Sequence, residues 1–206
     1  MKNPHVVVVE DSKKVFAVMV NPAAVTPFIQ VGQSKMPEGT LLASTGSYHD
    51  HGTPIGFLWD GDEVFKSKRT EKDHLRSHLI FANDARMYLD WAETCDATDK
   101  CVMQIGPKLV QFGKPCWQDN PEKFKPDAIR RAQHVAYGIT AAGKLLVCFF
   151  HDATLKMMAD WFIEKGCVSA CKSDGGHAAF LEFDGRRLGN QGVVACAFCL
   201  KLKVKK

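Results

Sequence analysis

The sequence predicts an α/β protein of the α+β kind, with a mixed, largely antiparallel sheet and few helices. Only one segment, residues 152–165, shows the apolar period of a long amphipathic helix. About nine or ten short apolar runs, bounded by glycine, proline and aspartate, have the length of strands instead. This pattern argues against a doubly wound parallel sheet. The length of 206 residues suits one domain over residues 1–206.

Turn residues divide the first half of the chain. Residues 1–39 are expected to form an N-terminal hairpin and a lead-in to the rest of the domain. Asp60-Gly61, between two apolar runs, is a strong hairpin signal. Residues 70–79 are polar and predict a short helix with His78 on an exposed face.

The C-terminal third has the clearest pattern. In the helix at 152–165, Asp152 is the expected N-cap, and apolar residues recur at i, i+3 and i+7. A strand is expected at 167–172, and it is followed by a sharp loop at Asp174-Gly175-Gly176.

Composition excludes disorder and coiled coils, since 46% of the residues are hydrophobic and 24% are charged. The formal net charge is +4. Much of that excess lies in a basic tail, residues 201–206, which is interpreted as a solubilising terminus in preference to a contact with nucleic acid or an anionic surface. No stretch approaches the roughly 20 apolar residues of a membrane span, and no signal peptide is recognisable. A cytoplasmic protein without membrane contact is therefore expected.

Eight cysteines are present, and several lie inside apolar runs. They are interpreted as reduced thiols that pack as small hydrophobes, with disulfides as the less favoured alternative. Cys196 and Cys199 have the spacing of half a zinc ribbon, but positions i and i+3 of a strand face opposite sides. No cofactor or metal site is predicted, and the sequence does not indicate a divalent cation.

Four landmarks occur in order between about residues 40 and 200, and the first two lie before residue 115. The first is Thr45-Gly46-Ser47-Tyr48-His49-Asp50, followed by Pro54-Ile55-Gly56 and the Asp60-Gly61 turn. The second is Gly106-Pro107-Lys108-Leu109-Val110, followed by Gly113-Lys114. Each is a weak signal by itself, because Gly-Pro and Asp-Gly pairs are common.

The other two landmarks lie after residue 130. The third runs from Arg131 to Gly138-Ile139 and into a hairpin, and the fourth is Asp174-Gly175-Gly176-His177-Ala178 after the helix. By their order and spacing, the four landmarks together resemble the phosphodiester glycosidase family, whose members include bacterial and phage proteins. The resemblance implies a phosphodiester-glycosidase-like domain with its functional cleft around Asp174.

The sequence departs from the family's pattern at several polar positions of the implied cleft. Thr45 stands where the family has Asn, and His177 and Ala178 stand where it has Gly and Ser. His134 falls at the position of a family Arg, with Arg131 three residues before it.

Asp174, Asp50 and His177 are the candidate catalytic residues. Glycoside cleavage usually uses two carboxyl groups on either side of the bond, and Asp50 and Asp174 are the implied pair. His177 would move a proton or donate to a phosphate oxygen near neutral pH. Amides of the glycine loop would bind an anion. Ligand binding is assigned to Thr45, Gly46, Tyr48, His49, Arg131, His134, Gly175, Gly176 and Asn190.

Three functions fit this pattern. The favoured one is a hydrolase that cleaves the glycosidic bond of a sugar-1-phosphodiester or a related sugar or nucleotide phosphodiester. The second is a catalytically degenerate module that sequesters a phosphorylated sugar or nucleotide in the same cleft. The third is a structural or assembly protein. The expected partner is a small-molecule phosphodiester or sugar-phosphate ligand, and nucleic acid is not favoured.

Overall fold

Strands dominate the computed structural model, which describes residues 4–61, 64–66, 77–81, 85–88, 101–119, 124 and 126–203. Every strand pairing in these residues is antiparallel. The prediction of a largely antiparallel architecture is confirmed. The α/β class overstated the helical part, because the one long helix within the described ranges is α2 (Leu155–Glu164).

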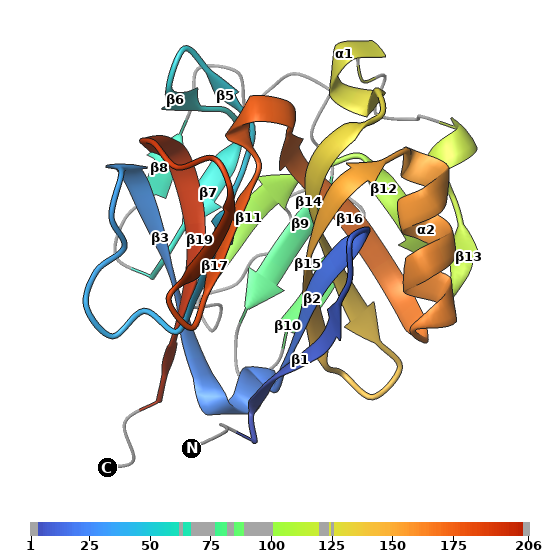
Figure 1. The fold of residues 1–206 in the computed structure, drawn as a ribbon, viewed down its shortest axis with the longest axis horizontal. Coiled ribbons are helices and arrows are strands. Elements are labelled where there is room, and N and C mark those ends of the chain that lie inside the picture. The colour runs from blue at the N-terminus through green and yellow to red at the C-terminus, as the bar shows by residue number, and fades with distance from the viewer. Residues whose placement is uncertain are drawn as a thin grey trace.

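The largest sheet has seven strands in the order β1-β2-β15-β14-β16-β12-β13 (Figure 1). Their bounds are Val6–Asp11 for β1, Val15–Val20 for β2, Lys108–Gln111 for β12, Lys114–Pro115 for β13, Ala132–Thr140 for β14, Leu145–Ala153 for β15 and Cys167–Gly175 for β16. The pairing of β1 with β2 confirms the predicted N-terminal hairpin.

Two sheets of five strands and one two-stranded ribbon complete the described fold. The order β18-β17-β4-β19-β3 joins Arg186–Gly189, Phe180–Phe183, Leu42–Thr45, Val194–Leu202 and Val25–Gln33. The order β10-β9-β11-β7-β8 joins Ala85–Tyr88, Ser77–Phe81, Cys101–Ile105, Phe57–Trp59 and Val64–Lys66. The ribbon pairs β5 (His49–Asp50) with β6 (Thr53–Pro54), and a short helix α1 spans Pro126–Ile129.

Two local predictions were wrong. The structure does not describe residues 70–76, but residues 77–79 belong to β9, and His78 is buried there, not exposed on a helix. Asp152 does not cap α2, because β15 continues through it. Thr154 is the N-cap, and its hydroxyl accepts a hydrogen bond from the Met157 amide at 3.3 Å.

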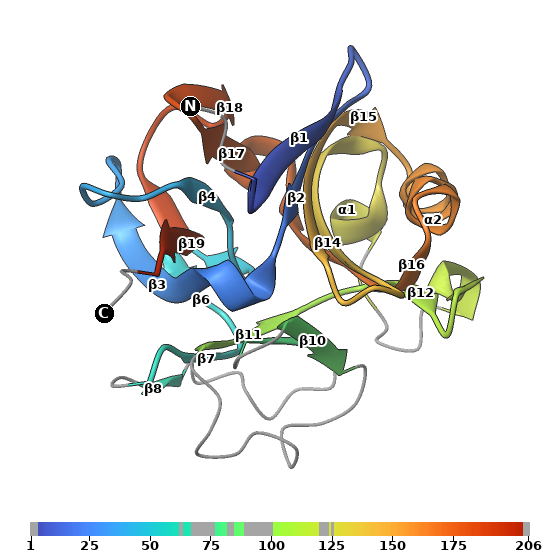
Figure 2. The ribbon, with the colours of Figure 1, turned by 90° about the horizontal axis from the view of Figure 1, so that it is seen from below.

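The core forms on both faces of the seven-stranded sheet. Side chains of β15 alternate: Val147 and Phe149 enter the cluster shared by the three large sheets, whereas Cys148 and Phe150 enter the cluster under α2. Helix α2 and the sheet that contains β4 lie on opposite sides of this layer (Figure 2). Burial on both faces explains why the central strands have continuous apolar sequences.

None of the seven cysteines among the described residues forms a disulfide, and all but Cys116 are buried; Cys95 lies outside the described residues. Within the described part of the chain, no helix has the length and apolar composition needed to span a membrane.

Gly138 of β14 lies close against α2. A Cβ there would lie 2.6 Å from Cε1 of Phe162 and 2.8 Å from Sγ of Cys167. Gly138→Ala is therefore expected to lower the free energy of unfolding by about 1–3 kcal/mol through overpacking. Urea denaturation measures this change. Gly192→Ala is the matched control, since its Cβ would meet only Asn190 Oδ1 at 3.4 Å. Equal stability of the two variants would contradict the prediction.

Candidate active site

Asp174 and Gly175 are the last two residues of β16, so the predicted glycine loop starts later than expected. The turn is the 3₁₀ helix η4 (Gly176–Ala178), in which Gly176 adopts a φ of 62°. The Gly175 amide donates to Asp174 Oδ1 at 2.7 Å. This bond orients the carboxylate and occupies an amide that the sequence assigned to ligand binding.

Gly175 has an ordinary φ of −145°, so its backbone conformation does not require glycine. The close approach of the His134 ring requires it instead. A Cβ at this position would overlap Nδ1 of His134. His134 is buried, and its Nε2–H donates to the Arg130 carbonyl at 2.9 Å. Burial and then the charge of Lys172 lower the His134 pKa to about 3. His134 is therefore neutral near pH 7 and does not supply the cationic charge of the Arg that it was expected to replace.

A cavity of about 280 Å³ opens beside the end of β16. We call it the charged cavity, because one carboxylate and two basic side chains, Arg130 and Lys172, line it among the described residues. Its lining includes Tyr48, His49, Arg130, His134, Lys172, Asp174, Gly175, Gly176 and His177. The structure thus brings together Asp174 and His177, two of the three predicted catalytic residues.

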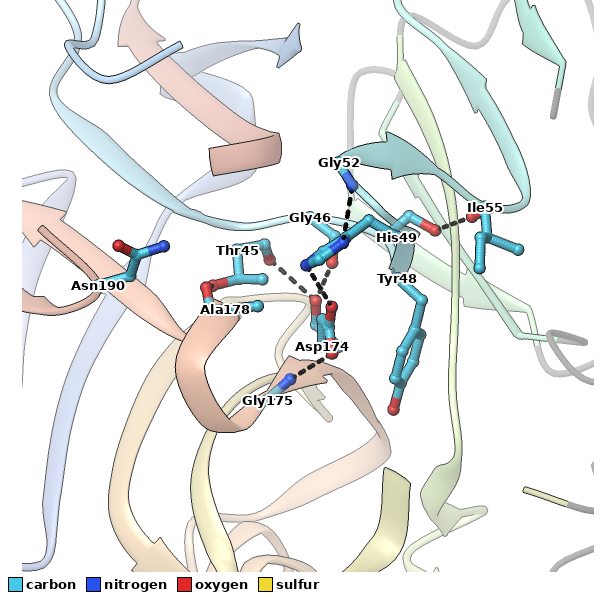
Figure 3. Close-up of polar contacts among 12 residues, drawn as sticks. Thr45, Gly46, Tyr48, His49, Gly52, Ile55, Asp174, Gly175, Ala178 and Asn190 are labelled. Atoms are coloured by element: carbon cyan, nitrogen blue, oxygen red, sulfur yellow. Dashed lines mark hydrogen bonds and ion pairs between the residues drawn. The ribbon is translucent and has the colours of Figure 1, made fainter. Parts of the chain in front are cut away.

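His49 faces Asp174 across this cavity (Figure 3), with Nε2 3.7 Å from Oδ2. The Gly52 amide donates to Nδ1 of His49 at 3.4 Å, so the neutral ring carries its proton on Nε2. The Asp174 side chain is 15% exposed. A partly buried carboxylate with an imidazole N–H directed at it can exchange protons with a bound ligand or water.

Asp50 does not lie beside Asp174 in this cavity. It follows His49 in β5, and side chains alternate along a strand, so the two point to opposite sides. The Asp50 side chain is 44% exposed and pairs with His51 Nδ1 at 3.0 Å. Among the described residues, Asp174 is the only carboxylate that lines the charged cavity.

Lys172 is the residue that sequence reasoning missed. It is buried, and its Nζ donates to the Tyr48 hydroxyl at 2.6 Å and to the Ser173 carbonyl at 2.9 Å. The ammonium also lies 4.8 Å from the centre of the Tyr48 ring. A lysine two residues before Asp174 shares a strand face with it, which is the signal that could have identified it.

Arg130 lines the charged cavity, whereas the predicted Arg131 does not. Arg131 forms an exposed ion pair with Asp152 at 2.9 Å. A Cβ on Gly176 would lie 3.5 Å from Nη2 of Arg130, which places this guanidinium beside the η4 turn. Two basic side chains therefore line the same cavity: Arg130, which follows α1, and Lys172 of β16.

Thr45 and Asn190 line a second cavity of about 280 Å³, which also includes His49 and Ala178. The Thr45 hydroxyl has internal partners: it accepts from the Phe180 amide at 2.7 Å and donates to the Ala178 carbonyl at 3.0 Å. Gly46 is buried, and its amide donates to the Cys196 carbonyl at 2.9 Å. Thr45 and Gly46 thus shape the site through these bonds, and their contact with a ligand stays a prediction.

No group of three or more His, Cys, Asp and Glu side chains in the described ranges could hold a metal ion. Cys196 and Cys199 are both buried in β19, where burial raises the pKa of the Cys196 thiol to about 12.

The described fold combines antiparallel sheets with a polar cavity at the end of β16. Residues 38–192 match the family described as phosphodiester glycosidase. The match covers most of the chain, so the chain belongs to this family.

The solved structures that share the fold include the following two. The catalytic domain of zebrafish N-acetylglucosamine-1-phosphodiester alpha-N-acetylglucosaminidase, auto-inhibited by its pro-peptide, has a TM-score of 0.73 and 12% identity, over 96% of this chain and 82% of that one. A hypothetical protein from Synechocystis has a TM-score of 0.68 and 13% identity, over 96% of this chain and 61% of that one. At these identities the likeness shows the fold alone. None of the curated proteins matches the chain significantly in sequence.

His134→Gln is expected to reduce the loss of unfolding free energy as the pH falls below neutrality. The folded-state pKa is about 3, whereas an unfolded histidine titrates near about 6.5, so the unfolded chain takes up the proton first. The contribution of the neutral ring is fully present above about pH 6.5. It is lost as the pH falls toward about 3, at up to about 1.4 kcal/mol per pH unit.

Urea unfolding of both proteins at about pH 7.5 and about pH 4.5 measures this effect. The wild type should lose more stability between the two pH values than the variant. Equal losses would show that the buried ring titrates normally.

Proposed function

We propose that the protein hydrolyses the glycosidic bond of a sugar-1-phosphodiester or a related sugar or nucleotide phosphodiester. The observation that carries this proposal is the composition of the charged cavity, in which one carboxylate, Asp174, is accompanied by Arg130 and Lys172. Membership of the phosphodiester glycosidase family supports it.

A single carboxylate is sufficient for this substrate class. Most glycosidases need a second carboxyl group to protonate the leaving oxygen, because an alkoxide is a poor leaving group. A phosphate monoester leaves as an anion without that proton, and fixed cations stabilise the charge that develops on it. Arg130 and Lys172 would take this role, and Asp50 is not required.

The hydrolytic step would then proceed as follows. A water oxygen attacks the anomeric carbon while the bond from that carbon to the phosphate oxygen breaks, and the electron pair leaves with the phosphate. Asp174 accepts a proton from the attacking water, and the His49 Nε2–H, 3.7 Å away, stabilises the carboxylate between turnovers. The products are the free sugar and a phosphate monoester.

Asp174→Asn is expected to lower kcat for a sugar-1-phosphodiester by about 10²–10⁴-fold, since the amide cannot accept the proton. Mass spectrometry of released sugar measures turnover, and thermal shift with the same ligand measures binding. Asp50→Asn is the matched control and should retain activity. Equal losses in the two variants would restore the two-carboxylate mechanism. A wild type that binds the ligand and releases no sugar would instead support the sequestering module.

Arg130→Gln is expected to raise KM for the phosphodiester about tenfold or more, because a charge-assisted hydrogen bond is worth about 1.5–3 kcal/mol. Arg131→Gln removes the same charge one residue away and should leave KM nearly unchanged, since Arg131 pairs with Asp152. Initial rates over a range of substrate concentrations distinguish the two. A larger effect at Arg131 would argue against Arg130 as the phosphate contact.

A further inference from the structure

The charged cavity has a neutral neighbour. The second cavity, of about 280 Å³, shares His49 and Ala178 with the charged cavity. We call it the neutral cavity, because apart from the shared His49 none of its lining residues within the described ranges is ionisable near neutral pH. Asp174 Oδ2 lies 3.7 Å from His49 Nε2 on the charged side, so the one carboxylate lies next to a residue that the two cavities share.

The neutral cavity combines polar and apolar groups. Asn190 lines it beside the exposed Val193, and Ala195 of β19 lies on the same wall. Asn190 Oδ1 accepts from the Gly192 amide at 2.7 Å, which fixes the orientation of the side-chain amide. Its Nδ2 makes one long bond, 3.5 Å to the Val193 carbonyl, so a second N–H has no partner among the described residues.

We propose that the neutral cavity is the glycosyl subsite, which holds the sugar while the charged cavity holds its phosphate. This inference rests on the proposed function. A sugar ring carries no charge, has hydroxyl groups at its edge and C–H groups on its faces, and so suits a wall of amide and small apolar groups. A phosphate is strongly favoured beside Arg130 and Lys172. The anomeric carbon then lies at the junction, within reach of Asp174.

If the neutral cavity holds the sugar, filling it should weaken the binding of a sugar ligand and leave the binding of phosphate unchanged. Ala195→Leu and Val193→Trp both fill the neutral cavity, and Val193 is 64% exposed, so its replacement leaves the core intact. The probes are inorganic phosphate and a non-hydrolysable C-glycosyl phosphonate monomethyl ester of N-acetylglucosamine. Calorimetry is expected to show the Kd of the phosphonate raised about tenfold or more in both variants, with the Kd of phosphate changed less than about twofold.

Two controls locate the effect. Val168→Trp replaces a half-exposed valine of β16 that lines neither cavity, and it should change neither Kd. Arg130→Gln should weaken both probes. An unchanged Kd of the phosphonate in Val193→Trp and Ala195→Leu overturns the glycosyl subsite, as does a wild type that does not bind the phosphonate.

Turnover of the corresponding phosphodiester separates this inference from the proposed function. Release of sugar by the wild type, together with unchanged phosphonate binding in the filled variants, would retain the hydrolase and reject the subsite. Absence of turnover, together with weakened phosphonate binding in the filled variants, would reject the hydrolase and retain a two-part binding cleft.

Discussion

The arrangement of the cleft depends on a buried set of hydrogen bonds that converges on Thr45 of β4. The Tyr137 hydroxyl donates to the Thr45 carbonyl at 2.6 Å from the seven-stranded sheet, and the Ser173 hydroxyl donates to the same oxygen at 2.9 Å. The Thr45 hydroxyl bonds to the backbone of Ala178 and Phe180. One residue thus ties β4 to β14, β16 and the η4 turn. Because these groups are buried, each lost partner would leave a polar atom unsatisfied. The bonds therefore fix the position of the two sheets relative to each other. Asp174 comes directly after Ser173, and its position opposite His49 follows from this constraint.

Much of the fold could be predicted from local patterns. Long apolar runs with clear turns correspond to β14 and β15, and the amphipathic period at 152–165 corresponds to α2 (Leu155–Glu164). The errors arose where tertiary contacts decide. Asp174 and Gly175 look like a loop in sequence, but pairing of Gly175 with His134 extends β16 through them. His78 looks polar and exposed, but β9 lies between β10 and β11, where its side chain is buried. Local sequence does not contain these pairings.

The candidate site could be located but not assembled in detail. The order of the landmarks led to Asp174, and the structure places Tyr48, His49 and His177 around it. The sequence assigned roles to Asp50 and Arg131, whereas His49 and Arg130, each one residue earlier, line the charged cavity. A shift of one residue in a strand moves a side chain to the opposite face, so His49 and Asp50 of β5 point in different directions. Lys172 was overlooked because it ends the predicted strand at 167–172, and its place in the cavity lining and its bond to Tyr48 show that it belongs to the cleft.

The position of β19 has a consequence for synthesis of the protein. This strand lies between β3 and β4 in its sheet, so it pairs with residues 25–33 and 42–45, which leave the ribosome much earlier. Until Val194–Leu202 emerges, β3 and β4 lack their shared neighbour, and the wall formed by residues 193–196 is missing. A nascent chain that already contains Asp174 and its cations therefore has no complete cleft, and a stop codon before β19 would remove the site together with the sheet. Before β19 is synthesised, the edges of β3 and β4 that it will cover are open to pairing with other strands. The chain is therefore exposed to aggregation during this interval.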